Sequence, residues 1–378
     1  MPPKTTRIDP HATPRASRTK KYTPDAREFP ALTLSGSSPT QNSAKGDGSG
    51  SGRADSIVFK ALLAKLPCVP KMQSFADSGN STNSRTPTKA ELDLKECERL
   101  EKVVPCPDIM KNLVKKLRGS LTARRQPTQD DPFMSRLTVE NRCAHLPGSI
   151  CSEHDTEDWV HNAILRPAVA VLQYLLYNNT KTEDFPNISS VGGSAPIPDS
   201  VLFKLSRIAD NAILTIEFKT HAVLSAEWLD AINVLLASAK GSDTPGSAAR
   251  FHWPEFEDTK SDKTTSILLQ VWGQMRKWRV KYAILSSYRH TYFFFKPNVQ
   301  SDTLYITDGF ESDDEDLLPS TVSWLALALG IYPFDDLELP EPNTQHWDFA
   351  SMTRFESTGL NPRTYPPSPQ AANANRRR

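Results

Sequence analysis

The chain has 378 residues, which is long enough for a sizeable core and, on length alone, for two or three domains. Its apolar fraction is only 38% and it contains 30 prolines, a combination that predicts one ordered region with disordered extensions. The formal net charge is +1, so the chain as a whole is not a general binder of polyanions. Any affinity for DNA or RNA must therefore come from local patches of basic residues.

The five cysteines are scattered without a C-x-x-C pair, and no apolar run approaches the length of a membrane span. These features predict an intracellular protein, nuclear or cytoplasmic, with no membrane partner. Basic residues cluster between Lys115 and Arg125, and arginines occupy positions 376–378. A solvated helix face is the more frequent explanation of the first cluster, with phosphate contact or nuclear import as alternatives.

Changes in composition predict four segments, in chain order: 1–88 largely disordered, 89–150 a helical lead-in, 151–340 an α/β domain, and 341–378 a disordered tail. Within the first segment, Ile57–Leu66 could form a short helix, or a segment that folds only against a partner. Within the lead-in, Ala90–Val104 is polar and periodic as in a helix.

The segment 151–340 alternates between helical and strand patterns. Helices are expected over 157–177, 226–239, 264–279 and 319–330. Strands are expected over 199–205, 211–219, 282–286, 291–296 and 304–307, with loops over 178–196 and 241–263. Pro167 lies inside the first helix and predicts a kink or a restart there. Interleaved strands and helices indicate an α/β fold with a mixed β-sheet flanked by helices.

The second expected strand places two opposite charges on one face. Side chains alternate along a strand, so Thr215, Glu217 and Lys219 share one side while their apolar neighbours share the other. Glu217 could ligate a divalent cation while Lys219 reaches the same phosphate. An isolated Glu-x-Lys on a strand is more often a solvated edge.

Asp199 begins the preceding strand. If the two strands pair through the turn near Asn211, Asp199 and Glu217 approach each other only with a bulge or an offset in register. If they do meet, their carboxylates form a hard-oxygen site suited to Mg²⁺ or Mn²⁺.

The sequence Pro198-Asp199, followed by Glu217-Phe218-Lys219, resembles the signature of the PD-(D/E)XK phosphodiesterase superfamily, whose members have a restriction-endonuclease-like fold. The resemblance implies that Asp199 and Glu217 bind the metal and that Lys219 orients or activates the attacking water. The metal would polarise the phosphate and lower the pKa of bound water.

Two further features fit this family. Gln270 and Gln274 are four apart on the expected helix 264–279, where RecB-like nucleases carry a glutamine motif beside the active site. Glu157 resembles the additional acid that many members place on the first helix, with Glu153 as the substitute. The alternatives are that the glutamines form the wet face of a helix and that Glu157 is a favourable first-turn acid.

The closer resemblance is to the amino-terminal region of fungal-type kinase proteins, through Trp272-Gly273-Gln274 and through Ser287-Tyr288 followed by Phe293-Phe294. The chain departs from the superfamily in having no clear strand before Asp199 and an insertion before the glutamine helix. Kinase motifs (a glycine-rich loop, HRD or DFG) do not occur in this sequence, which argues against a kinase.

Two functions remain open at this point. The first is Mg²⁺-dependent hydrolysis of phosphodiester bonds in DNA or RNA. The second is a non-catalytic module of the same fold that binds nucleic acid or a protein partner and regulates a kinase-like protein, since fold alone does not fix activity.

Overall fold

The computed structural model describes the chain in separate stretches, all of which belong to one unit, Arg53–Arg378. The described residues are 55–72, 88–128, 130–177, 185–191, 197–204, 212–224, 247–254, 263–307, 309–334, 337, 339–340 and 343–348, the last range by its backbone alone.

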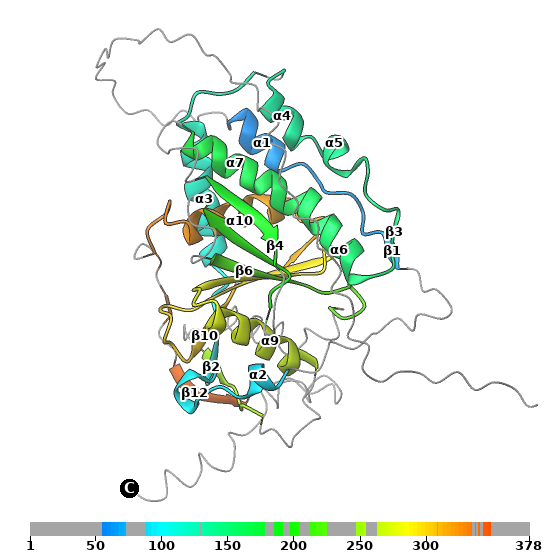
Figure 1. Ribbon diagram of the computed structural model, residues 1–378. Helices are drawn as coiled ribbons and strands as arrows, with labels where there is room; N and C mark the ends of the chain where they lie inside the picture. Colours follow the sequence, from blue (N-terminus) through cyan, green and yellow to red (C-terminus); the bar gives the residue numbers. More distant parts are fainter. Residues whose placement is uncertain are drawn as a thin grey trace, which may run out of the picture. The chain divides into compact units, whose positions relative to one another are not determined.

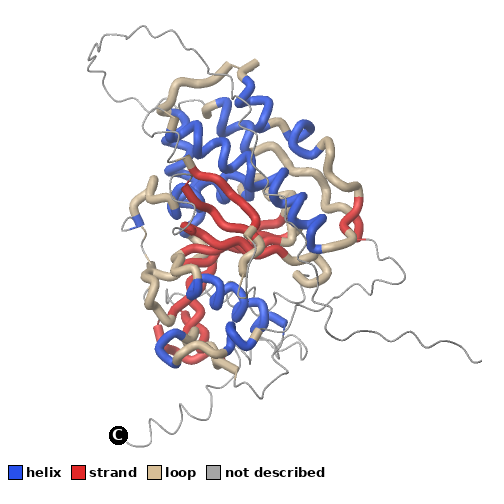
Figure 2. The backbone as a smooth tube through the Cα atoms, in the orientation of Figure 1, coloured by secondary structure: helices blue, strands red, loops and turns tan. Residues whose placement is uncertain are grey.

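A ten-stranded mixed β-sheet forms the centre of this unit (Figures 1 and 2). Its strand order is β12 (Asn343–Asp348), β7 (Ser247–Arg250), β2 (Lys102–Pro105), β10 (Thr303–Ile306), β9 (His290–Phe295), β8 (Tyr282–Ser286), β6 (Ala212–Phe218), β5 (Ser200–Lys204) and β4 (Pro186–Ser190), with β11 (Phe310–Glu311) also paired to β9. The pairs β12–β7, β2–β10 and β6–β8 are parallel and the others are antiparallel. The prediction of a mixed sheet is confirmed. A separate parallel pair joins β1 (Lys71–Met72) to β3 (Ser149–Ile150).

The sheet has a hydrophobic core on each face, because its central strands are apolar at successive positions. On β8, Tyr282 and Ile284 join one core while Ala283 and Leu285 join the other. The first core contains α1 (Ile57–Leu62), α3 (Ile109–Thr122), α4 (Pro132–Leu137), α6 (Glu153–Val160), α7 (Arg166–Leu176) and α10 (Leu317–Ala328). The second contains α9 (Lys263–Lys277) (Figure 1). The short elements α2 (Lys89–Leu92), η1 (Glu96–Glu98) and α5 (Val139–Cys143) complete the described helices. Among the stretches that the structure describes, no helix is long and apolar enough to cross a membrane.

The expected helix 157–177 is interrupted, as its proline predicted. Between α6 and α7 lies one π-helical turn, η2 (His161–Leu165). Pro167 has no N–H and crowds the carbonyl four residues earlier, so the Ala163 carbonyl loses its helical donor. The guanidinium of Arg142, on α5, donates from Nη1 to that carbonyl at 2.7 Å. The π turn is therefore held by a side chain from a different helix.

Besides the short strands β1 and β3, four strands of the large sheet lie where the sequence predicted other structure. β2 falls at the end of the expected helix Ala90–Val104, where Val103 and Val104 are buried in the sheet. Pairing with β10 outweighs the polar helical pattern before it, since β-branched residues fit a sheet. β4 and β7 lie inside the two expected loops, and β12 lies in the expected tail. β4 is an edge strand with several exposed polar residues, which gave no apolar pattern to recognise.

The short helix expected near Ile57–Leu66 is confirmed as α1, and it is not isolated. Val58, Phe59 and Leu62 are buried against the first core. Arg118 on α3 forms an ion pair with Asp55 just before the helix. The expected helix 226–239, most of residues 1–88 and the end of the tail lie outside the described residues.

One buried cation stands out in the second core. Lys296, directly after β9, is fully buried, and within the described part of the chain its ammonium has no hydrogen-bond partner. Its Nζ lies 5.1 Å from the centroid of the Trp272 ring. Burial, together with the nearby Arg276 guanidinium, lowers the pKa of Lys296 to about 7.

We predict that Lys296→Met stabilises the protein most strongly at low pH. Between about 7 and the ordinary lysine value of 10.5, the unfolded chain binds more protons at this position than the folded chain, so wild-type stability rises with pH there. The advantage of the variant in free energy of unfolding should shrink by about 2 kcal/mol between about pH 6 and about pH 9. Urea denaturation at both pH values measures it, and an advantage independent of pH would contradict the assignment.

Candidate functional site

The pairing of β5 with β6 brings Asp199 opposite Glu217. Ser200 pairs with Ile216, so the next pair outward along this register is Asp199 with Glu217. The main-chain N–H of Phe218 donates to Asp199 Oδ2 at 2.6 Å. A register shift between Leu202 and Phe203 supplies the irregularity that this approach requires. The two predicted carboxylates therefore meet at the same end of the sheet.

Lys219 completes this cluster from the position directly after β6. Its Nζ donates to Glu217 Oε1 at 2.5 Å and to Glu153 Oε1 at 2.9 Å. Its main-chain N–H donates to the Ser286 carbonyl of β8 at 3.1 Å, which continues the parallel pairing beyond the last strand residue. Both Glu217 and Lys219 are buried, with 3% and 4% of their surface exposed. The end of β6, an otherwise apolar strand, therefore holds a buried ion pair.

Gln274 ties the cluster to α9. Its Nε2 donates to Glu217 Oε2 at 2.6 Å and to the Ile197 carbonyl at 3.2 Å. One amide therefore fixes the rotamer of Glu217 and also the backbone just before Asp199. Gln270, one turn earlier on α9, is also fully buried, which excludes the wet helix face considered from the sequence. Among the described residues, the side chains that donate to Glu217 are Lys219 and Gln274.

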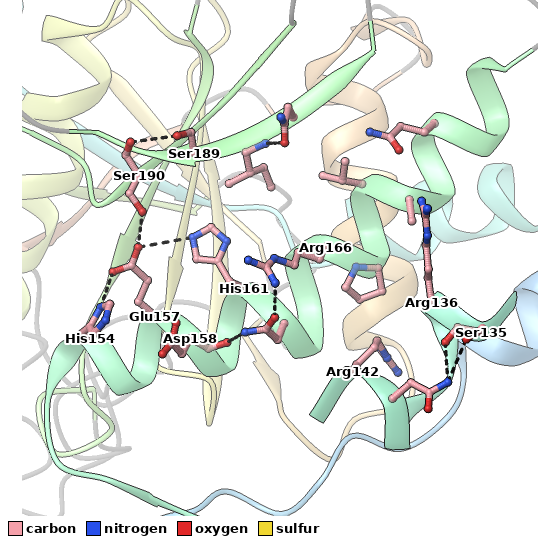
Figure 3. Close-up of a pocket in the computed structure, with 18 residues that line it drawn as sticks. Ser135, Arg136, Arg142, His154, Glu157, Asp158, His161, Arg166, Ser189 and Ser190 are labelled. Carbon is pink, nitrogen blue, oxygen red and sulfur yellow. Dashed lines mark hydrogen bonds and ion pairs between the residues drawn. The ribbon is translucent and has the colours of Figure 1, made fainter. Parts of the chain in front are cut away.

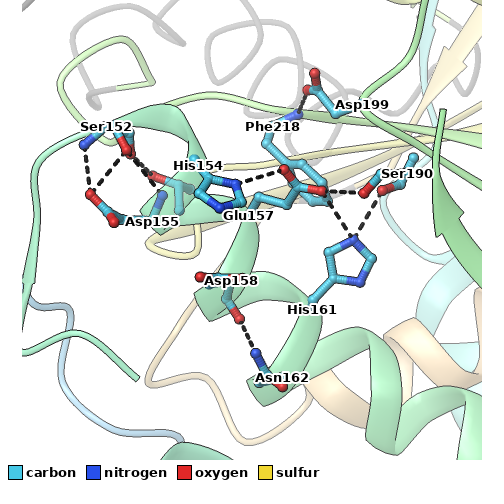
Figure 4. A network of polar contacts seen from close by, with 12 residues as sticks. Ser152, His154, Asp155, Glu157, Asp158, His161, Asn162, Ser190, Asp199 and Phe218 are labelled. Carbon is cyan, nitrogen blue, oxygen red and sulfur yellow. Dashed lines mark hydrogen bonds and ion pairs between the residues drawn. The ribbon is translucent and has the colours of Figure 1, made fainter. Parts of the chain in front are cut away.

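The acid beside Lys219 is Glu153, and Glu157 lies elsewhere. α6 begins at Glu153 because Ser152 caps it, accepting from the Asp155 N–H while Asp155 accepts from Ser152. Glu157, one turn further on, faces β4, where the Ser190 hydroxyl donates to its Oε1 at 2.5 Å (Figure 4). Glu153, the substitute in the sequence interpretation, thus takes the place expected of Glu157.

Three carboxylates now surround one ammonium. Burial, followed by the charge of Glu217, raises the pKa of Asp199 to about 8, although Lys219 and the Phe218 N–H oppose the rise. Burial by itself would lower the pKa of Lys219, but the charges of Glu217, Glu153 and Asp199 outweigh it and raise that pKa above its ordinary value. With all groups ionised, the cluster carries a formal charge of −2, which a divalent cation would neutralise.

The donor set suits a hard cation with a small number of protein ligands. No group of three or more His, Cys, Asp or Glu side chains arranged for a metal occurs in the described stretches. Mg²⁺ needs no such group, because it commonly binds through one or two carboxylates and keeps several waters. Asp199 and Glu217 are the residues that would hold it, since each carboxylate oxygen has two lone pairs and can accept a hydrogen bond while ligating.

An open groove of about 830 Å³ follows α6, η2 and α7 along the edge strand β4 (Figure 3). The cluster residues do not line it, and its near end is at Glu157, one helical turn from Glu153. At its near end His161 Nε2 lies 2.9 Å from the Ser200 hydroxyl and 3.7 Å from Glu157 Oε1. Burial lowers the pKa of His161, although the charge of Glu157 opposes the shift. The sequence interpretation missed His161, yet its position four residues after Glu157 places it on the same helix face.

Comparisons with protein-family models, with curated proteins and with solved structures gave no match to this chain.

We predict that Asp199→Asn stabilises the protein in the presence of a chelator. The folded pKa of Asp199 is about 8 and lies above its ordinary value of 3.8, so the folded state binds more protons between these values and wild-type stability falls as pH rises. The amide keeps an acceptor for the Phe218 N–H. Its advantage in free energy of unfolding should be about 1 to 3 kcal/mol larger near pH 7.5 than near pH 5. Denaturant unfolding measures this difference. Equal advantages at both pH values would show that folding does not raise the pKa of Asp199.

Proposed function

We propose that this protein is a metal-dependent phosphodiesterase of the PD-(D/E)XK type that hydrolyses bonds in DNA or RNA. The observation that carries the proposal is the juxtaposition of Asp199, Glu217 and Lys219 with Gln274, through strand pairing and hydrogen bonds that join three separate elements. An ion pair retained only for stability would not require two further carboxylates beside it, because uncompensated like charges at a half-buried site are costly.

The arrangement of elements supports the same proposal. α6 and α7 precede β4, β5 and β6 in the chain, and α9 and β8 follow them. This is the order of the family core, and β4 supplies the strand that the core normally has before the aspartate. The glutamine on α9 lies beside the acid pair, as expected of a RecB-like motif. A restriction-endonuclease-like core is part of the proposal.

Each side chain has a separate role in this scheme. Asp199 and Glu217 hold Mg²⁺ or Mn²⁺, and Gln274 keeps Glu217 in its ligating rotamer. When bound, the ion polarises the scissile phosphate and lowers the pKa of a bound water. Lys219 is protonated in the metal-free site because its pKa is raised, so it stabilises charge and orients water by donating hydrogen bonds. Glu153 fixes the lysine from the opposite side.

One observation favours the alternative of a non-catalytic binding module. Both oxygens of Glu217 already accept hydrogen bonds, one from Lys219 and one from Gln274. A site retained for shape alone would keep this closed network and bind no metal. Metal binding and cleavage separate the two functions.

We predict cleavage of nucleic acid that requires Mg²⁺ or Mn²⁺ and is lost in Glu217→Gln/Lys219→Met. The loss should be on the order of a hundredfold or more, the size expected for removing charge-stabilising groups. Activity should rise with pH towards about 8, because Asp199 must lose its proton to ligate a metal. Plasmid and single-stranded substrates, with and without chelator, provide the assay. Glu140→Gln/Lys111→Met is a control of the same charge change outside the site.

Absence of metal-dependent cleavage on either substrate, with a folded protein, would contradict the enzymatic function. Binding of nucleic acid that both variants retain would then favour the non-catalytic module.

Glu153 and Glu157 offer a matched pair of substitutions one helical turn apart. We predict that Glu153→Gln lowers kcat about fivefold, the effect of losing a half-exposed ion pair to Lys219. Glu157→Gln should leave kcat nearly unchanged, because its contacts are to His154, His161 and Ser190. Steady-state kinetics of both variants decide it. A larger loss in Glu157→Gln would return the catalytic role to that residue.

A further inference from the structure

The groove along α6, η2 and α7 is lined by more basic than acidic side chains. Three arginines line it: Arg136 on α4, Arg142 on α5 and Arg166 at the start of α7 (Figure 3). Arg136 and Arg166 are exposed. Arg142 uses Nη1 to hold the Ala163 carbonyl, while its Nε and Nη2 are buried with no hydrogen-bond partner in the described part of the chain. The exposed guanidinium groups of Arg136 and Arg166 are therefore the ones that can bind phosphate from solvent.

The two acids that line the groove, Glu157 and Asp158, lie together on α6. Glu157 accepts from the Ser190 hydroxyl and lies within 4 Å of ring nitrogens of His154 and His161. Both acids belong to the end nearest the site, so the arginines dominate the remainder of the groove.

The groove is long, and no large aromatic side chain lines it among the described residues. Gln173 follows His154 by nineteen positions on one helical run, which corresponds to about 28 Å at 1.5 Å per residue. No Phe, Tyr or Trp occurs among the described residues that line it, and the remaining polar groups are amides, hydroxyls and the imidazoles of His154 and His161 at the end near Glu157. Bases bind single-strand proteins largely by stacking on such rings. This groove offers contacts to a sugar–phosphate backbone instead.

The groove also leads to the reactive end of the sheet. Glu157, at its near end, is one helical turn from Glu153, which contacts Lys219. A strand lying along α7 and η2 would therefore run towards Glu153 and Lys219 at this end of the sheet. It would pass the end of β6 to reach Asp199 and Glu217 on the face of α9.

We propose that this groove binds the sugar–phosphate backbone of a nucleic-acid strand, without reading its bases, and directs it to the site. The inference rests on the proposed function for its choice of ligand, and the binding of that ligand requires no catalysis. Arg136 and Arg166, whose side chains are exposed, contact phosphates along the groove.

The test is fluorescence anisotropy with a labelled single-stranded oligonucleotide and with an abasic strand of equal length, in chelator and over a series of salt concentrations. Arg136→Gln/Arg166→Gln changes exposed residues and should weaken binding about tenfold or more. The slope of log affinity against log salt should fall by about 1.4, since each phosphate contact to a single strand contributes about 0.7. Lys60→Gln/Lys65→Gln, outside the groove, is the control with the same charge change.

Ser189→Glu provides a second variant that removes no cation and adds a negative charge at an exposed position of β4 in the groove. It should weaken binding as well, and the abasic strand should bind like the normal one. Equal affinity of the groove variants and the control, or a large preference for the strand that has bases, would overturn the inference. Tight binding of a mononucleotide that competes with the strand would also overturn it, in favour of a small anionic ligand.

The two proposals fail separately. Weaker binding in the groove variants together with no cleavage by the wild type would keep the groove and reject the nuclease. Metal-dependent cleavage with an unchanged KM in the groove variants would keep the nuclease and reject the groove.

Discussion

The hydrogen bond from the Phe218 N–H to Asp199 marks the register on which the site depends. It sets the end of β5 against the end of β6, and it places Asp199 opposite Glu217 on the face that α9 covers. A slip of one residue would turn Glu217 towards the other core and move Phe218 into the site. The bulge after Leu202 is part of this register, since it offsets the strand pairs on its two sides by one residue.

The clustered charges of Asp199 and Glu217 lower the stability of the metal-free folded protein. Two carboxylates share a poorly solvated position, and the rise in the pKa of Asp199 shows that burial and repulsion disfavour its charged form. Lys219 and Gln274 offset part of that cost through direct hydrogen bonds to Glu217. A divalent cation would offset the rest. Perturbed acids that cluster at the end of a sheet are typical of functional sites, although ion-pair networks also produce them.

Much of the fold could be predicted from local patterns. β5, β6, β8, β9 and β10, together with the helices α9 and α10, lie close to the ranges that hydrophobic periodicity indicated. Of the five tryptophans that the sequence predicts to be core residues, Trp159, Trp272 and Trp324 are buried, Trp278 is partly buried, and Trp228 lies outside the described residues. Strands β4, β7 and β12 carry little apolar signal, and they exist because neighbouring strands supply their hydrogen bonds. Such pairing is long-range information that a single sequence does not display.

For the site, the sequence could predict which residue types take part but not how they are arranged in space. The alternation of side chains along a strand predicted that Glu217 and Lys219 share a face. Their approach to Asp199 depended on a bulge, which the sequence indicated without giving its position. Glu153 was the substitute because α6 was expected to begin four residues later than its Ser152 cap sets it. The groove was missed because its walls come from segments far apart in the chain, and because β4 was expected to be a loop.

The most direct test of the account is calorimetric titration of the metal-free protein with Mn²⁺ at neutral pH, beside Asp199→Asn/Glu217→Gln. The account predicts one Mn²⁺ bound per chain by the wild type, with release of a proton from Asp199, and no binding by the double variant. Equal binding by both proteins would place the metal elsewhere. No binding by a folded wild type at millimolar Mn²⁺ would contradict the claim that these carboxylates form a metal centre.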